Sequence, residues 1–216
     1  ILGFYNIIDF AKNHNIKKIL YASSSSVYGD SNSFQLNEKQ NIKPKNIYAL
    51  SKKINEEMAN VFSNQFNISL IGLRFFTVYG EWGRPDMFMM KYLNSSYDVS
   101  KKFYLNNYGN HTRDFTYIDD VVNIVFKLMN KIPKKLATKK PSEYESKVPW
   151  RIYNVSSSRP QKLKLFINEI EKQLGKKFRY NKLPLQKGDV EKTSGSMSLT
   201  VKKIGFKPKR KLKYGI

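Results

Sequence analysis

Two short apolar runs with a helical stretch between them constrain the fold of this chain most strongly. The first run covers about residues 17–23, and the second, ISLIGLRFF, covers residues 68–76. The segment between them, about residues 46–65, carries apolar residues at helical spacing, namely Ile47, Leu50, Ile54, Met58, Val61 and Phe62. In a strand–helix–strand unit the helix usually connects two parallel strands by a right-handed crossover, and it covers one face of the sheet. We therefore predict an α/β fold with a parallel sheet.

The rest of the chain continues this alternation less regularly. We expect helices at about residues 1–14, 86–97, 118–130 and 162–175, the last ended by Gly175, and strands near residues 103–106, 151–155 and 178–184. These elements predict the C-terminal part of a doubly wound sheet, followed by a smaller α/β lobe. The chain opens at Ile1 inside an amphipathic pattern formed by Leu2, Tyr5, Ile8 and Ala11. We therefore expect the N-terminal part of the fold to lie outside this sequence.

Composition argues against several classes of function. The 216 residues include no cysteine, which excludes disulfides and thiolate metal sites and favours a cytoplasmic protein. The two histidines, His14 and His111, lie far apart, so we expect no metal site. No apolar run reaches the roughly 18 residues of a membrane span. The net charge of +22 comes mainly from lysines spread along the chain, so we expect no nucleic-acid partner, although residues 131–147 and 207–213 are locally basic.

Polar side chains follow both apolar runs, at the strand ends where open α/β sheets bind ligands. Four serines, Ser23–Ser26, follow the first run. Tyr48 and Lys52 lie four residues apart on the next predicted helix, so they share one face, and a lysine ammonium beside a phenol stabilises the phenolate as a base. With 14 tyrosines the Y-x-x-x-K spacing also arises by chance, and Tyr97–Lys101 is a second example. The serine cluster about 24 residues upstream favours the Tyr48 pair.

Six blocks of the sequence carry a resemblance to a known family. They are YASSSSVYG, YALSK, LRFFTVYGEWGRPDM, RDFTYIDD, LPLQKGDV and IGFKPK. Together they resemble the extended short-chain dehydrogenase/reductase family in its nucleotide-sugar epimerase branch, and most closely the UDP-glucuronate 4-epimerases. Each block is weak alone, whereas six in the family order are specific. The resemblance implies a Rossmann-type NAD-binding domain whose second half is residues 1–80, and a substrate-binding lobe in residues 81–216, from which residues 108–155 return to the sheet.

The resemblance also implies roles for individual positions. The catalytic Ser/Thr, the tyrosine base and its lysine match Ser24, Tyr48 and Lys52. The cofactor NAD is expected to contact Tyr48, Lys52 and Phe76. The substrate is expected to be a UDP-sugar. Its carboxylate would meet Thr77 and Arg84, its diphosphate Arg113, and its uridine the segment with Gln186 and Asp189, while Ser25 and Ser26 lie near the sugar. A homodimer is the expected assembly.

The implied reaction is epimerisation at C4 of the sugar. Tyr48 takes the 4-OH proton while C4 passes its hydride to NAD, Ser24 bonds the same oxygen, and the flat 4-keto sugar turns over before the hydride returns. A 4-keto glucuronate readily loses carbon dioxide, so an epimerase must hold its carboxylate, which suits Arg84 with Thr77. Relatives that decarboxylate or dehydrate the sugar usually carry an acid at the places of Ser25 and Ser26. We therefore expect conversion of UDP-glucuronate to UDP-galacturonate, a precursor of surface polysaccharide.

Three departures from the family pattern stand beside this resemblance. The glycine-rich dinucleotide turn is absent from these residues, Glu81 replaces a common proline, and SGSMSLTVKKIG lacks an aspartate often found there. Ser23 is expected to bond backbone groups, Arg74 to pack or form an ion pair, and Asp119 and Asp120 to cap a helix.

Two alternatives stay open, a UDP-glucose/galactose-type 4-epimerase and a non-catalytic sugar-nucleotide-binding remnant.

Overall fold

The computed structural model describes residues 1–216 apart from residues 32, 34, 99, 101, 132 and 134–146. Its first sheet contains β1 (Lys18–Ser24), β2 (Ser69–Phe75) and β6 (Trp150–Val155), all parallel and in the order β1-β2-β6. Ser24 pairs with Phe75, and Phe75 pairs with Val155, so the three carboxyl ends lie side by side. This arrangement confirms the predicted α/β fold with a parallel sheet.

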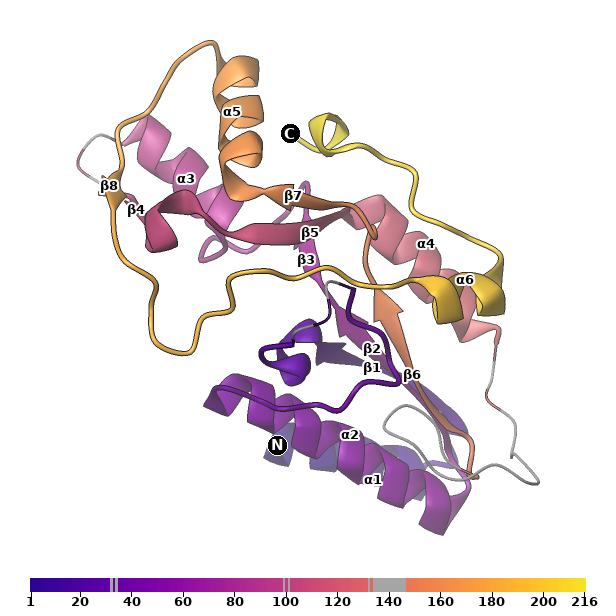
Figure 1. The fold of residues 1–216 in the computed structure, drawn as a ribbon. Coiled ribbons are helices and arrows are strands. Elements are labelled where there is room, and N and C mark those ends of the chain that lie inside the picture. Colours follow the sequence, from indigo (N-terminus) through magenta and orange to yellow (C-terminus); the bar gives the residue numbers. More distant parts are fainter. Residues whose placement is uncertain (32, 34, 99, 101, 132, 134–146) are drawn as a thin grey trace.

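Helices cover both faces of this sheet (Figure 1). On one face lie α1 (Leu2–Asn13) and α2 (Ile47–Phe66), and on the other lie α4 (Ile118–Met129) and α6 (Ser198–Ile204). Neighbouring residues of β2 face opposite cores. Leu70 packs in one cluster with Ile8 of α1, whereas Ile71 packs in another with Ile124 of α4. Burial on both faces explains the nearly unbroken apolar run at residues 68–76.

A second, smaller lobe is built on the sheet of β3 (Thr77–Tyr79), β5 (Thr112–Tyr117) and β7 (Pro160–Lys162). β3 and β5 are parallel, whereas β5 and β7 are antiparallel. The helices α3 (Phe88–Tyr97) and α5 (Leu163–Leu174) pack here around an aromatic core, in which the Phe115 and Phe166 rings stack with centroids 4.5 Å apart. The smaller elements are β4 (Tyr104–Leu105) paired with β8 (Asn181–Lys182), and the 3₁₀ helices η1 (Ser25–Tyr28), η2 (Asn106–Gly109) and η3 (Leu212–Tyr214).

The elements that the sequence predicts have observed bounds within a few residues of the expected ones, whereas β3, β5, β7 and α6 were not predicted. Gly175 ends α5 as predicted, with φ of +67° and its N–H directed at the Lys172 carbonyl. β6 joins the first sheet while β5 joins the second, and the proposed division at residue 80 stays a prediction. Lys101 of the second Y-x-x-x-K pair, and most of the basic segment 131–147, fall outside the described residues.

The apolar side of α2 lies mainly on the outer surface of the molecule. Ile47, Leu50 and Val61 are exposed, whereas the residues buried by this helix are Ala49, Asn55, Glu56, Ala59 and Ser63. The outer surfaces of α1 and α2 together form a groove, here called the α1–α2 groove, lined by Tyr5, Leu50, Lys53, Ile54, Glu57, Met58, Val61 and Phe62. The predicted helix is therefore confirmed, but most of its apolar side does not face the sheet.

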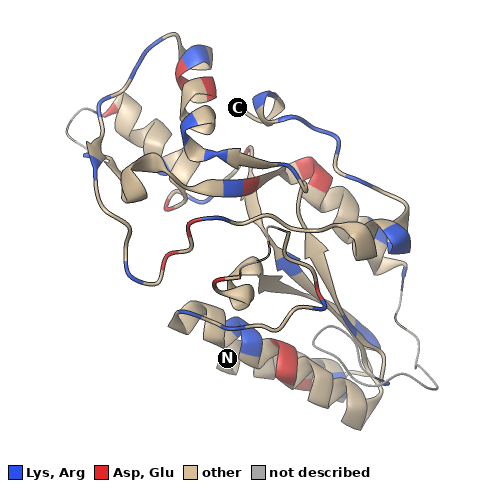
Figure 2. Ribbon diagram, viewed as in Figure 1, with Lys and Arg blue, Asp and Glu red and all other residues tan. Residues whose placement is uncertain are grey.

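Lysine and arginine residues are spread over both lobes and along the C-terminal segment (Figure 2). Within the described ranges, no helix has the length and apolar character needed to cross a membrane. The same residues contain no group of three or more His, Cys, Asp or Glu side chains suited to a metal ion.

Candidate functional site

The chain turns sharply at the end of β1. Ser24 is the last residue of β1 and caps η1, because its Oγ accepts a hydrogen bond from the Ser26 N–H at 3.1 Å. Gly29 follows this turn with φ of +62°, and a Cβ there would meet the Lys43 carbonyl oxygen. The backbone therefore holds the Ser24 hydroxyl in a defined turn at the carboxyl end of the strand.

Tyr48 and Lys52 lie on the first turns of α2, beside that strand end. Asn46 caps the helix, since its Oδ1 accepts a hydrogen bond from the Ala49 N–H at 2.8 Å. Lys52 Nζ donates to the Ala22 carbonyl on β1 at 3.0 Å and lies 5.9 Å from the centre of the Tyr48 ring. Tyr48 is 55% exposed, so its phenol is open to a ligand. The structure thus brings Tyr48 and Lys52 together, and it holds Lys52 against β1 two residues before Ser24.

A buried ion pair lies one turn further along α2. Arg74 of β2 donates from Nε and Nη2 to the two carboxylate oxygens of Glu56, at 3.0 and 2.8 Å, and Ser23 Oγ donates to Glu56 Oε1 at 2.5 Å. The Arg74 guanidinium also lies 4.7 Å from the centre of the Tyr28 ring. Burial lowers the pKa of Arg74, but the hydrogen bonds and charge of Glu56 outweigh burial and leave it raised. Arg74 thus forms the ion pair considered in the sequence analysis, whereas Ser23 bonds a carboxylate rather than the backbone.

A second buried network is centred on Asn154 of β6. The Tyr28 hydroxyl donates to Asn154 Oδ1 at 2.7 Å, and the Asn154 N–H donates to Glu38 Oε1 at 2.7 Å. The side-chain nitrogen Nδ2 of Asn154 donates to the Leu36 backbone carbonyl, and the Thr200 hydroxyl donates to the Asn154 backbone carbonyl. Burial raises the pKa of Tyr28 to about 12 and also raises the pKa of Glu38. These bonds fasten the loop after η1 and the start of α6 to the same end of the sheet.

Phe76 lies directly after β2 and is buried against Tyr28 and Leu36. A Cβ at Gly195 would come within 2.7 Å of the Phe76 ring, so the segment near residue 195 passes very close to it. Asp114 of β5 holds this segment in place, because its carboxylate accepts bonds from the Gly195 N–H at 3.0 Å and the Ser157 hydroxyl at 2.6 Å. Burial raises the pKa of Asp114. Contact between Phe76 and NAD stays a prediction.

Thr77 and Arg84 lie near each other in sequence but differ in environment. Thr77 begins β3 and is half-buried. Arg84 lies on the loop after β3 with its side chain 72% exposed, and it pairs with Asp86 at 3.2 Å. On the same loop, Trp82 is 98% exposed and has φ of +59°. The guanidinium of Arg84 is therefore available at the surface, and its pairing with a substrate carboxylate stays a prediction.

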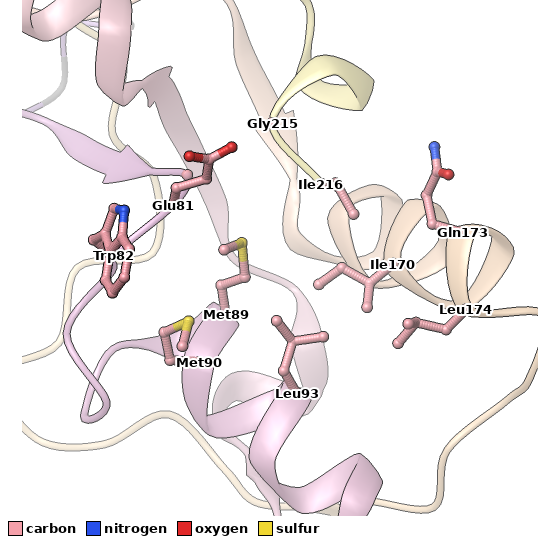
Figure 3. A pocket seen from close by; sticks show the side chains of 11 residues that line it. Glu81, Trp82, Met89, Met90, Leu93, Ile170, Gln173, Leu174, Gly215 and Ile216 are labelled. Carbon is pink, nitrogen blue, oxygen red and sulfur yellow. The ribbon is translucent and has the colours of Figure 1, made fainter.

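Gly80, Glu81 and Trp82, before Arg84 in this part of the chain, border a largely apolar pocket of about 490 Å³ (Figure 3). It is lined by Gly80, Glu81 and Trp82, by Met89, Met90 and Leu93 of α3, by Ile170, Gln173 and Leu174 of α5, and by Gly215 and Ile216. In Figure 3 the side chains of Met89, Leu93 and Ile216 point into the space between α3 and α5. No residue predicted to bind substrate or cofactor lines this pocket.

The predicted diphosphate arginine and the predicted uridine segment meet each other directly. Arg113 Nη2 donates to Asp189 Oδ1 at 3.1 Å, and His111 Nε2 lies 3.0 Å from Asp189 Oδ2. The hydrogen bond with His111 and the charge of Arg113 lower the pKa of Asp189 despite partial burial, and burial lowers the pKa of Arg113. Gln186 is exposed and donates to the Pro184 carbonyl at 3.2 Å. Arg113, His111 and Asp189 thus form one cluster, and Gln186 stands apart from it.

Sequence reasoning did not identify Glu56, Glu38 or Asp114 as parts of the site. A signal for Glu56 was present, because it follows Tyr48 and Lys52 at the same four-residue spacing. The partners of Asp114 and Glu38 lie between 43 and 116 residues away in the chain, so no local pattern marks them.

Comparison with known proteins gives consistent matches. The family model described as the NAD dependent epimerase/dehydratase family matches residues 1–140. Protein CapI of Staphylococcus aureus is 39% identical over 220 residues, covering 100% of this chain and 66% of that protein. A probable UDP-glucuronate 4-epimerase of Rhizobium meliloti is 33% identical, covering 100% of this chain and 64% of that protein. The crystal structure of UDP-glucuronic acid 4-epimerase from Bacillus cereus, in complex with UDP-glucuronic acid and NAD, superposes with a TM-score of 0.85 at 26% identity, over 100% of this chain and 64% of that one.

The chain spans 50–66% of the length of the curated relatives that it matches. The family model nevertheless covers well over half of this chain, and it includes both the serine cluster and the Tyr48–Lys52 pair. The resemblance seen in the six sequence blocks is therefore confirmed: this chain belongs to the NAD dependent epimerase/dehydratase family.

Proposed function

We propose that this protein is an NAD-dependent UDP-glucuronate 4-epimerase that forms UDP-galacturonate, a precursor of surface polysaccharide. The observation that carries the proposal is the position of Lys52. Its ammonium bonds the Ala22 carbonyl at the end of β1 and lies beside the exposed phenol of Tyr48, close in the chain to Ser24. Relatives and a solved structure with this activity in their names support the choice of reaction.

The residues present suit a nicotinamide cofactor. An ammonium has three donors, and Lys52 uses one of them on Ala22, so two are left for ribose hydroxyls. Phe76 is buried beneath Gly195 and would form part of the wall of the cleft rather than a polar contact. When bound, NAD supplies the acceptor and donor of hydride at C4 of the sugar.

Tyr48 would remove and later return the proton of the sugar 4-OH. Lys52 stabilises the phenolate by its positive charge, so that Tyr48 can accept this proton and later return it. Ser24 lies at the end of β1, where its hydroxyl can bond the same sugar oxygen and orient it. The open position of Tyr48 gives a substrate access to the phenol, whereas the capped turn restricts the motion of Ser24.

The choice of a uronic acid substrate rests on Arg84 and Thr77. Arg84 is exposed and bonded only weakly to Asp86, so it can exchange that carboxylate for the carboxylate of glucuronate. Holding this group away from the cleavage geometry protects a 4-keto glucuronate from losing carbon dioxide. Ser25 and Ser26 add hydroxyls near the sugar without adding a second acid. Arg113 would bind the diphosphate after exchanging its bond to Asp189, with Gln186 close to the uridine.

The test uses the whole encoded protein, incubated with NAD and UDP-glucuronate, with products separated by chromatography. We expect UDP-galacturonate to form without release of carbon dioxide, and Tyr48→Phe to lower turnover by about 10²-fold or more while NAD stays bound. Release of carbon dioxide, or no conversion, would refute the proposal. If Arg84→Ala left turnover of UDP-glucose intact while UDP-glucuronate was never a substrate, the UDP-glucose/galactose-type epimerase would be correct. Failure of NAD to copurify with a folded protein would favour the non-catalytic alternative.

We also propose that the protein is a homodimer assembled through the α1–α2 groove. The groove exposes Leu50 and Val61 to solvent, although an apolar helix face is normally covered. It also contains Lys53 and Glu57, four residues apart, so a two-fold copy running antiparallel would set lysine against glutamate on both sides. Sedimentation of Val61→Lys should give a monomer, with Lys12→Ala on α1 as the dimeric control. A monomeric parent protein would contradict this assembly.

A further inference from the structure

Three side chains on α2 recur at four-residue spacing, and two of them bond residues near the end of β1. Tyr48 is exposed, Lys52 bonds the Ala22 carbonyl, and Glu56 is 2% exposed and accepts the Ser23 hydroxyl. The first two belong to the proposed proton-transfer site. The third lies beneath it, and the reaction has no direct use for its charge.

Arg74 extends the contacts of Glu56 to both sides of Ser24. It stands opposite Ser23 in the register of β1 and β2, and it binds both oxygens of the Glu56 carboxylate. Its guanidinium also lies over the ring of Tyr28, which ends η1. Glu56, Arg74, Ser23 and Tyr28 are here called the clamp. The clamp holds the residue before Ser24 by a hydrogen bond, and the turn after Ser24 by a cation–π contact.

Stability alone is a weak reason for a buried ion pair of this kind. Removing two charges from water is costly, and well-packed apolar residues of similar volume often give equal or greater stability. Apolar residues could not, however, accept the Ser23 hydroxyl, and they would not carry a cation over Tyr28. The feature that distinguishes the ion pair from an apolar filling is therefore the position it imposes on the segment from Ser23 to Tyr28.

We propose that Glu56, acting through Arg74 and Ser23, is a positioning residue that fixes the Ser24 hydroxyl relative to Tyr48 and Lys52. The helix that carries Tyr48 and the strand that carries Ser24 meet at the Glu56 carboxylate, so the clamp sets the distance between them. This inference rests on the proposed epimerase function for its kinetic consequence, and on the contacts of the clamp alone for its structural one. Glu56 does not touch substrate or cofactor in this account.

The decisive variant replaces both charges at once. In Glu56→Leu/Arg74→Met the space is filled by apolar side chains, so the melting temperature is expected to stay near that of the parent protein. The positioning role is nevertheless lost, and we expect kcat for UDP-glucuronate to fall about 100-fold, as for a displacement of about 1 Å in a reacting pair, with KM changed less than about twofold. A merely structural role would let kcat recover together with stability, and that result would overturn the proposal.

A second variant guards against failure of the double substitution to fold. Ser23→Ala removes a single hydroxyl and leaves the ion pair intact, and we expect kcat to fall about tenfold with KM unchanged, as for the loss of one charge-assisted hydrogen bond. Ser63→Ala removes a buried hydroxyl from α2, seven residues after Glu56 and on the same face of that helix, so it serves as the matched control and should leave kcat unchanged. Equal effects of Ser23→Ala and Ser63→Ala would contradict the proposal.

Amide hydrogen exchange, measured by mass spectrometry on the same proteins, separates this inference from the proposed function. In both clamp variants the peptide covering residues 23–29 should exchange faster, since the Ser26 N–H depends on Ser24 Oγ and the Gly29 N–H on the Ser26 carbonyl. Exchange in β2 and β6 should not change. Should the parent protein fail to convert UDP-glucuronate, the proposed function would fall and this exchange pattern alone would decide the clamp. Unchanged exchange at residues 23–29 would refute it.

Discussion

The two ends of the candidate site are stabilised in different ways. At the serine end, formed by Ser24, Tyr48 and Lys52, the polar groups rest on a buried ion pair and a buried asparagine network. At the arginine end, formed by His111, Arg113 and Asp189, the polar groups bind one another directly. In the proposed function the serine end is therefore built before any ligand arrives, whereas Arg113 at the arginine end would exchange Asp189 for the diphosphate of the substrate. We propose that this difference corresponds to a division between proton transfer at the serine end and substrate binding at the arginine end.

Physical requirements of the two tasks explain the contrast. Proton transfer depends steeply on the distance and angle between reacting groups, so it benefits from a rigid support. Binding of a diphosphate depends mainly on charge, and an arginine that is already desolvated and kept in place by an aspartate can change partner at modest cost. Substitutions at the two ends should therefore affect different kinetic constants.

The largest effect is expected from Tyr48→Phe. Removal of the phenol hydroxyl eliminates the proposed general base, and kcat for UDP-glucuronate should fall about 10²- to 10⁴-fold, with KM little changed. The measurement is steady-state turnover together with the NAD content of the purified protein. A loss confined to KM would place Tyr48 among binding residues and would remove the distinction between the two ends.

A smaller effect, of the opposite kind, is expected from Arg113→Ala. Loss of a charge-assisted contact of about 1.5–3 kcal/mol should raise KM about 10- to 100-fold and leave kcat at saturation near that of the parent protein. Calorimetric titration with UDP should give the same loss of affinity. Lys202→Ala removes an exposed cation from α6, outside both ends of the site, and is the control. A fall in kcat as large as that of Tyr48→Phe would show that the arginine end also positions the reacting atoms.

The smallest effects concern the pH dependence of stability, and they should differ in sign. Burial raises the pKa of Glu38, so its contribution is complete below the ordinary carboxyl pKa and is lost as the pH rises through the raised value. The pKa of Asp189 is lowered, so its contribution is present above the ordinary value and is lost as the pH falls through the lowered one. The parent protein should therefore lose stability through Glu38 as the pH rises, and Glu38→Gln should abolish that loss. It should lose stability through Asp189 as the pH falls, and Asp189→Asn should abolish that second loss.

Urea denaturation from about pH 3 to pH 8 measures both slopes, and a single proton contributes at most about 1.4 kcal/mol per pH unit. Glu38→Gln keeps an acceptor for the Asn154 N–H, which makes it a conservative change. The quantity compared is the change in the slope of unfolding free energy against pH that each substitution causes. Changes of the same sign in the two variants would contradict the contrast between Glu38 at the serine end and Asp189 at the arginine end.

The sequence predicted the elements better than it predicted their buried connections. Apolar runs and helical spacing located β1, β2 and α2, because burial on two faces leaves a continuous signal. The four-residue spacing correctly placed Tyr48 and Lys52 on one face. Periodicity could not show that the apolar side of α2 lies largely on the surface, since the burial of Glu56 depends on Arg74, a residue 18 positions away.

The remaining site residues show a similar limit. Arg113 and Asp189 were each identified by resemblance, but their mutual bond joins residues 76 positions apart and has no local signature. Asp114 stands next to Arg113 in the sequence, and only its two partner segments reveal that it fixes the chain near Gly195. Contacts made across the fold, rather than along one element, account for what sequence reasoning missed.

The bonds of Asn154 determine when, during synthesis of the chain, the support of the serine end can form. This residue joins Tyr28 and Glu38 to Thr200, so the support of the serine end combines segments made early and late. A nascent chain that has left the ribosome only as far as β2 carries Ser24, Tyr48 and Lys52 but lacks Asn154, Gly195 and Thr200. The support of the serine end is thus incomplete until residue 200 has left the ribosome.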